Sequence, residues 1–124
     1  MVNSIKLKSH IEKRIEKENL EAISYKEKLD KDFMYGFSWY SEPIFKSLFM
    51  ARLYETIFLR SEGMKSNLED SIKGLSEYFT QDILEGYLSV NSSSSLSNSK
   101  SIWELECKKT FVRDCGDMIG RFEE

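Results

Sequence analysis

The sequence contains few of the residues that mark metal sites, disulfide frameworks and helix breaks: it has one proline, one histidine and two cysteines among 124 residues. Two cysteines are too few for a disulfide framework, and one histidine beside Cys107 and Cys115 falls short of a structural zinc site. No Gly-rich phosphate loop and no protease or hydrolase motif is present. The sequence therefore predicts a protein without metal, without cofactor and without enzymatic activity.

Long apolar runs and an excess of basic charge are missing as well. The first residues carry charges instead of the apolar stretch of a signal peptide, and no segment has the roughly 20 apolar residues that a membrane-spanning helix needs. Lysine and arginine total 18 against 21 aspartates and glutamates, which gives a net charge of -3. Because polyanion-binding proteins are usually basic, we expect a cytoplasmic protein that binds neither nucleic acid nor membrane directly.

The length predicts one domain, spanning residues 1–124. For a mass of 14.6 kDa, the scaling of surface with size gives about 6,900 Å² for the folded chain and about 21,000 Å² for the unfolded chain. Burial of about two thirds of the surface suffices for a hydrophobic core that needs neither metal nor disulfide bonds.

Apolar residues recur at every third and fourth position, which is the spacing of amphipathic helices. The first predicted helix spans residues 9–31 and carries one apolar stripe among Lys, Arg and Glu. The only histidine, His10, lies in this charged segment and is expected to be an ordinary exposed side chain. Residues 1–8 fit either a short strand or an extension of the helix, and the sequence leaves that choice open.

An aromatic-rich segment, residues 33–40, precedes the second predicted helix. Gly36 disfavours a helix there, so we expect a connector. Ser41 can accept a hydrogen bond from a free amide, and Pro43 suits a first helical turn. The second helix is therefore predicted to begin near Ser41 and to stop at about Gly63.

Segment 44–59 is apolar on all sides, because 11 of its 16 residues are apolar or aromatic. Such a helix is buried in a bundle or lies in an interface between subunits. Arg52 interrupts this apolar segment. Three roles fit it: facing water, forming a local ion pair, or receiving a partner's carboxylate or phosphate. The aromatic side chains predict core packing or, as a weaker alternative, a ligand pocket: Phe45, Phe49, Tyr54 and Phe58.

Residues 67–88 give the clearest amphipathic pattern, with one apolar stripe and a start that Asn67 or Ser66 can cap. Segment 89–99 follows, and seven of its eleven residues are serine. This composition predicts a mobile loop, because it cannot bury enough apolar surface to hold one shape.

The last helix is predicted to start at Ser101, which forms a capping-box pattern with Glu104. On that helix Cys107 and Cys115 lie about 12 Å apart, which is too far for a disulfide bond, so both are expected to be small buried residues. The predicted fold class is therefore all-α: a small bundle of three to four helices, arranged up-and-down or as two packed hairpins, with the serine-rich loop before the last helix.

Negative charge is concentrated on the solvent side of the predicted helix 67–88. Two interpretations fit this pattern: a face that keeps the protein soluble, or a surface that attracts a basic protein. For the second interpretation, aromatic residues and an arginine supply anchors. The predicted partner-binding residues are Glu69, Asp70, Glu77, Glu85, Trp39, Tyr40 and Arg52.

These observations together predict a protein-binding module. In its most specific form, this is a bacterial immunity or antitoxin-type inhibitor whose acidic helix occludes the basic surface of a nuclease toxin, a hypothesis that rests on class and charge alone. The alternative is a structural or assembly protein that forms a homodimer through the apolar helix 44–59.

Overall fold

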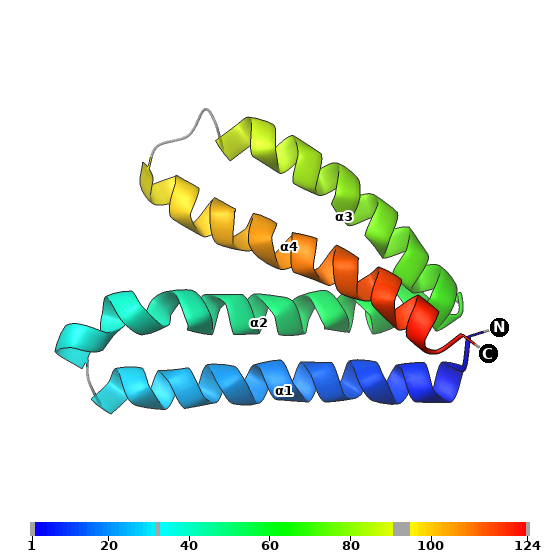
Figure 1. Cartoon of the computed structure of the whole chain (residues 1–124), viewed down its shortest axis with the longest axis horizontal. Helices are drawn as coiled ribbons and strands as arrows, with labels where there is room; N and C mark the ends of the chain where they lie inside the picture. The colour runs from blue at the N-terminus through cyan, green and yellow to red at the C-terminus, as the bar shows by residue number, and fades with distance from the viewer. Residues whose placement is uncertain (1, 32, 91–94, 124) are drawn as a thin grey trace.

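In the described part of the chain, four helices form two antiparallel hairpins (Figure 1). The first hairpin joins α1 (Ser4–Lys31) to α2 (Phe33–Gly63), and the second joins α3 (Leu68–Val90) to α4 (Ser95–Arg121). The computed structural model describes residues 2–31, 33–90 and 95–123, with side chains described outside 33–39, 88–90 and 95–100. The predicted all-α helical bundle is confirmed, in the form of two packed hairpins.

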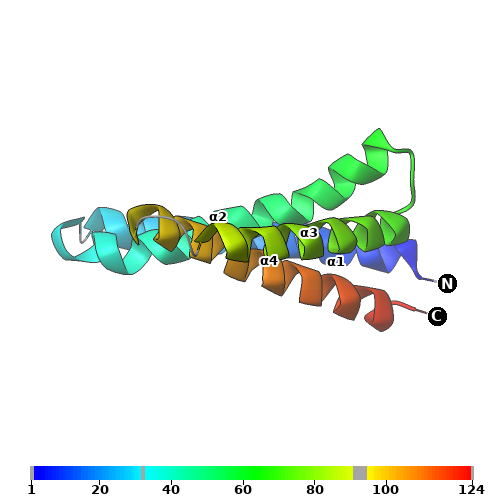
Figure 2. The same ribbon diagram turned by 90° about the horizontal axis from the view of Figure 1, so that it is seen from above.

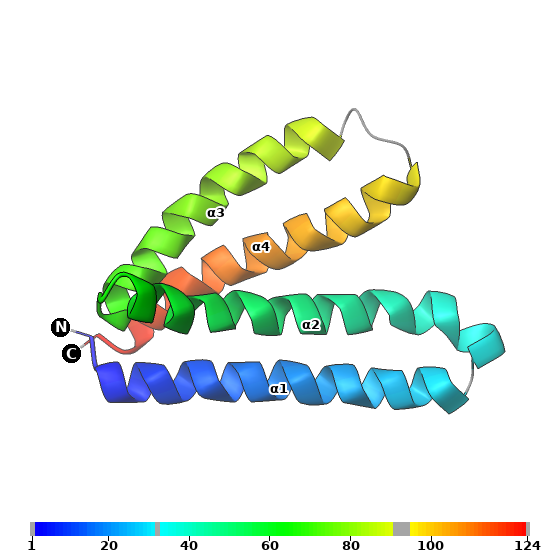
Figure 3. The same cartoon turned by 180° about the vertical axis from the view of Figure 1, so that it is seen from behind.

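The two hairpins meet at the end that carries both termini and diverge toward the other end (Figures 1 and 3). Seen from above, the C-terminal parts of α2 and α4 swing to opposite sides (Figure 2). The chain exposes 8311 Å², which is about a fifth more than its mass predicts for a compact fold. The divergence of the hairpins therefore leaves helix surface open to solvent.

Helix α1 begins at Ser4, so residues 4–8 of the undecided segment 1–8 are helical, and residue 1 lies outside the described part. The side chain of Asn3 caps it by accepting a hydrogen bond from the Lys6 amide at 3.1 Å. An isolated antiparallel bridge joins Val2 to Glu123 and brings the two ends of the chain together.

Helix α2 begins at Phe33, so the predicted connector at residues 33–40 is wrong. Pro43 lies inside the helix, although proline removes one backbone hydrogen bond there. Contacts with neighbouring helices offset this local cost: the Tyr40 ring packs on Tyr25 of α1, and the Phe45 ring packs on Trp103 of α4. Tertiary packing thus overrides the local signals for a break.

The core lies between the hairpins, and α2 contacts all three other helices. Phe111 of α4 is fully buried and receives edge-on contacts from Tyr54 of α2 and Phe79 of α3, each with ring centroids 5.5 Å apart. Cys107 and Cys115 are buried and free, as predicted. The central position of α2 accounts for its apolar character: Met50, Leu53, Tyr54 and Ile57 are all buried.

Helix α3 begins where the sequence predicted, because the Asn67 side chain accepts a hydrogen bond from the Asp70 amide at 2.8 Å. The predicted serine-rich loop 89–99 is too long: α3 continues to Val90, α4 begins at Ser95, and residues 91–94 lie outside the described part. The predicted start of α4 at Ser101 is also wrong. Serine costs less than about 0.7 kcal/mol per residue in a helix, so a serine-rich composition does not prevent one.

None of the helices in the described part of the chain has the length and apolar character that crossing a membrane requires.

Two glycines of the second hairpin differ in what surrounds them. A Cβ atom at Gly116 would meet nothing within 4 Å, whereas one at Gly86 would lie 2.5 Å from a methyl carbon of the buried Leu105. Gly86 therefore permits the close approach of α3 to α4, and Gly116 has no such role.

We expect Gly116→Ala to raise the free energy of unfolding by about 0.5–1 kcal/mol, because alanine loses less backbone entropy in a helix interior. Gly86→Ala should bring no such gain, because Leu105 must move. Urea unfolding of both variants measures the difference, and equal gains would contradict the packing assigned to Gly86.

Candidate protein-binding surface

The solvent side of α3 carries a line of acidic residues. Asp70 and Glu77 are seven residues apart, which places them nearly above one another on the helix, and both are exposed. Among the described residues, no cation lies within ion-pair distance of either carboxylate. Glu85 is exposed farther along the same side, where it accepts a long hydrogen bond of 3.5 Å from Gln81.

Other carboxylates of α3 are already paired. Glu69 is half-buried and lies 3.1 Å from the Lys73 ammonium, and Asp82 lies 2.6 Å from the ammonium of Lys108 on α4. Of the four acidic residues predicted to bind a partner, Glu69 is therefore the least available.

Two exposed apolar side chains lie among the acidic ones. Tyr78 is 60% exposed and Leu84 is 57% exposed. The sequence analysis missed both, although the helical period shows that they fall outside the inward stripe of α3. We define the α3 outer face as this exposed set: Asp70, Glu77, Tyr78, Leu84 and Glu85.

The other predicted binding residues lie away from the α3 outer face. Tyr40 is half-buried against Tyr25 on the first hairpin. The side chain of Trp39 lies outside the described residues. Arg52 is exposed on α2 beside the exposed Glu55, which favours the water-facing interpretation. The structure therefore splits the predicted set between the two hairpins.

The aromatic side chains of α2 pack in or against the core. Phe45 stacks on Phe49 with ring centroids 5.7 Å apart and contacts Trp103 at the same distance. Phe49 and Phe58 are partly buried against the core cluster that includes Tyr54. This packing accounts for the aromatic spacing without a ligand pocket.

A polar link joins α1, α2 and α4 beside the core. The Tyr54 hydroxyl donates to Asp114 at 2.5 Å, and the Arg14 guanidinium lies 3.7 Å from the same carboxylate. Arg14 Nε also donates to His10 Nε2 over 3.5 Å. Burial, followed by the hydrogen bond to Asp114, raises the pKa of Tyr54 well above 10, so the phenol stays protonated and acts as a donor.

His10 is half-buried, which corrects the expectation of an exposed side chain. Its ring lies 5.3 Å from that of Phe122, a residue beyond the end of α4 that the sequence pattern could not place beside α1. Burial raises the pKa of Glu18, one turn after Arg14, and thus disfavours a second charge near the polar link.

The two buried thiols are held in their protonated form. Burial raises the pKa of Cys107 to about 11 and that of Cys115 to about 12. Because the thiolate is the reactive species, neither side chain is suited to nucleophilic or redox chemistry in the folded protein.

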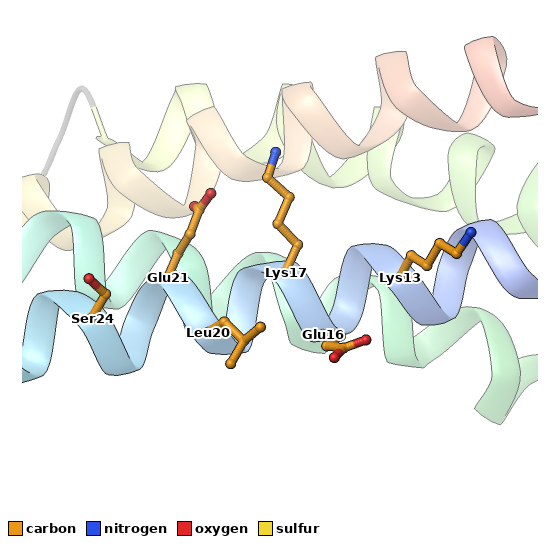
Figure 4. A pocket seen from close by; sticks show the side chains of 6 residues that line it. All are labelled: Lys13, Glu16, Lys17, Leu20, Glu21 and Ser24. Atoms are coloured by element: carbon orange, nitrogen blue, oxygen red, sulfur yellow. The ribbon is translucent and has the colours of Figure 1, made fainter.

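The hollow in Figure 4 lies along the solvent side of α1. Its volume is about 460 Å³, and all of its lining comes from one helix: Lys13, Glu16, Lys17, Leu20, Glu21 and Ser24. Lys17 and Glu21 point to one side in this view, and Leu20 and Glu16 lie below them (Figure 4). A strip on one helix does not enclose a ligand.

Comparisons with protein-family models, with curated proteins and with solved structures find no match to this chain. In the part of the chain that the structure describes, no group of three or more His, Cys, Asp or Glu side chains is placed to hold a metal ion. Of the acidic residues predicted to bind a partner, the α3 outer face holds the exposed ones: Asp70, Glu77 and Glu85.

We expect Tyr54→Phe to lower the free energy of unfolding by about 2 kcal/mol at neutral pH, because it removes a hydrogen bond to a carboxylate. The raised pKa of Tyr54 also means that the unfolded chain releases this proton first, so stability falls as pH rises above about 10. The free energy of unfolding of Tyr54→Phe should therefore fall less steeply than that of wild type as pH rises above about 10. Tyr78→Phe, at an exposed ring, is the matched control and should change neither quantity.

A thiol reagent at neutral pH should modify Cys107 and Cys115 only after unfolding. Mass spectrometry of the native and urea-unfolded protein measures the two rates. Rapid labelling of the native protein would show that the thiols are accessible and would contradict their assigned burial.

Proposed function

We propose that this protein is a protein-binding module that recognises a basic partner through the α3 outer face. The observation that carries the proposal is the exposure of Asp70 and Glu77 without a described ion pair, next to the exposed Tyr78 and Leu84. Desolvated apolar and aromatic side chains supply most of the affinity in protein interfaces. The carboxylates supply attraction over a distance and discriminate against acidic partners.

The dimensions of the face are those of a helix-mediated contact. Asp70 and Leu84 are 14 residues apart, which corresponds to about 21 Å along α3. Glu77 lies between them on the same line, so one partner surface can contact all three. Lys73 and Lys108 pair with Glu69 and Asp82 at the sides of α3, whereas Asp70 and Glu77 on its outer face have no ion pair among the described residues.

The specific form that we propose is an immunity or antitoxin-type inhibitor in the bacterial cytoplasm. In this form, the α3 outer face covers the basic surface with which a toxin nuclease holds its nucleic acid. The inhibitor acts by occlusion, so it needs no catalytic group. One copy inhibits one toxin molecule.

Self-association through α2 is the second candidate function. The packing of α2 against the other helices disfavours it. The apolar side chains that motivated it face the other three helices. Within segment 44–59, the exposed residues form a narrow stripe in which Leu48 and Leu59 are separated by Arg52 and Glu55. Charges at the centre of such a stripe disfavour a stable homodimer interface.

The test compares partner capture by three forms of the protein. Wild type, an outer-face variant (Asp70→Asn, Glu77→Gln, Glu85→Gln) and a matched α1 variant (Glu12→Gln, Glu16→Gln, Glu27→Gln) are immobilised and exposed to native cell lysate at low and moderate salt. We expect wild type and the α1 variant to retain the same basic protein, and the outer-face variant to retain at least tenfold less. Retention should fall as salt rises, because screening weakens the charge attraction.

Equal capture by all three forms would show that the α3 outer face is not the binding surface. If the captured protein is a nuclease, one equivalent of wild type should abolish its activity and one equivalent of the outer-face variant should not. Light scattering of the purified protein tests the second candidate, which predicts a dimer that Leu48→Glu with Leu59→Glu dissociates.

A further inference from the structure

The termini end of the molecule carries a hollow of the opposite charge. It lies where the first turns of α1 approach the end of α4 (Figure 1), and its volume is about 420 Å³. Its basic side chains are Lys6, Lys13 and Arg121. A smaller hollow of about 340 Å³ adjoins it and shares Lys6 and Arg121.

The cations in this hollow come from distant parts of the chain. Lys13 and Arg121 are more than one hundred residues apart in sequence, and the packing of α4 beside α1 brings both to one hollow. Among the described residues, neither has a carboxylate within ion-pair distance. The Arg121 guanidinium lies instead over the Phe122 ring, 5.6 Å from its centroid.

Among the described residues, two carboxylates near the hollow, Asp114 and Glu123, form no ion pair with Lys13 or Arg121. Asp114 accepts a hydrogen bond from Tyr54 and pairs with Arg14, and Glu123 lines the adjoining hollow only. Cations that converge on one hollow repel one another and attract an anion. This local excess stands against the net charge of -3 of the whole chain.

His10 lines the hollow, and its pKa is affected by the positive charges around it. Burial lowers its pKa, and Arg14, Arg121 and Lys13 act in the same direction, while Asp114 opposes them. Because Nε2 accepts from Arg14, the neutral ring carries its proton on Nδ1 and has a donor left for a ligand.

We propose that this hollow is a binding site for a small phosphate monoester. Lys13 and Arg121 hold the phosphate, with the Ser9 hydroxyl as a neutral donor at the same hollow. The ring of Phe122 and the exposed side chain of Ile5 offer an apolar wall for the organic part. The volume lies within the range of small-molecule sites.

Binding at this site can be followed by NMR, because the Cε1 proton of His10, the only histidine in the sequence, gives one resolved signal. The test follows the pH titration of that signal by proton NMR in the presence of phenyl phosphate, inorganic phosphate or sodium chloride at equal ionic strength. We expect phenyl phosphate to raise the pKa of His10 saturably at millimolar concentration, because a bound dianion favours the charged imidazole. Inorganic phosphate should act more weakly, and chloride should not saturate.

The variants Lys13→Gln and Arg121→Gln change exposed side chains, so we expect both to fold. Each should weaken binding of phenyl phosphate roughly threefold to tenfold, since each removes one charge-assisted contact. Lys26→Gln, at an exposed position nearer the other end of α1, is the control and should bind like wild type.

Two outcomes would overturn the proposal. If chloride and phenyl phosphate shift the His10 signal equally, the hollow only experiences ionic screening. If Lys26→Gln weakens binding as much as Lys13→Gln, the ligand responds to overall charge and not to this site. The α3 outer face shares no residue with the hollow and is intact in all these variants, so the result is independent of the proposed partner binding.

Discussion

The contact of Phe111 with Tyr54 and Phe79 holds the two hairpins together, and the other features of the molecule depend on it. The three rings come from α4, α2 and α3 and meet edge to face, with Phe111 fully buried. This packing fixes which side of each helix faces inward. It therefore decides that Asp70 and Glu77 of α3 face solvent and that the end of α4 lies beside the start of α1. Hydrophobic burial is non-directional, so the ring geometry supplies the orientation.

The polar link from Tyr54 through Asp114 to Arg14 complements this contact. A half-buried carboxylate is costly unless donors surround it, and here the donors come from two other helices. The link thus penalises any other arrangement of α4 against α1 and α2. Its position next to the aromatic contact means that the apolar and polar interactions select the same packing. A chain has one folded state when its apolar and polar interactions favour the same arrangement.

The same packing separates charges of opposite sign. The α3 outer face collects carboxylates, whereas the hollow at the termini collects Lys13 and Arg121. The divergence of the hairpins adds exposed surface, since the chain shows 8311 Å² to solvent. The acidic surface lies on α3 and the basic hollow lies between α1 and the end of α4. A protein with two such surfaces can hold a macromolecule on one and a small anion on the other, because each surface acts mainly within a Debye length of about 8 Å.

The sequence by itself determined the helices, the inward stripes of α1 and α3, the burial of Cys107 and Cys115 and the acidic character of α3, because these follow from local periodicity and composition. The start of α2 at Phe33 could not be predicted, since the contacts of Tyr40 and Phe45 with other helices outweigh Gly36 and Pro43. The half-buried state of His10 could not be predicted either, because it depends on Phe122 from the far end of the chain. Only the tertiary structure decides which distant residues meet, because the pairing of helices depends on the packing of whole faces and not on local spacing.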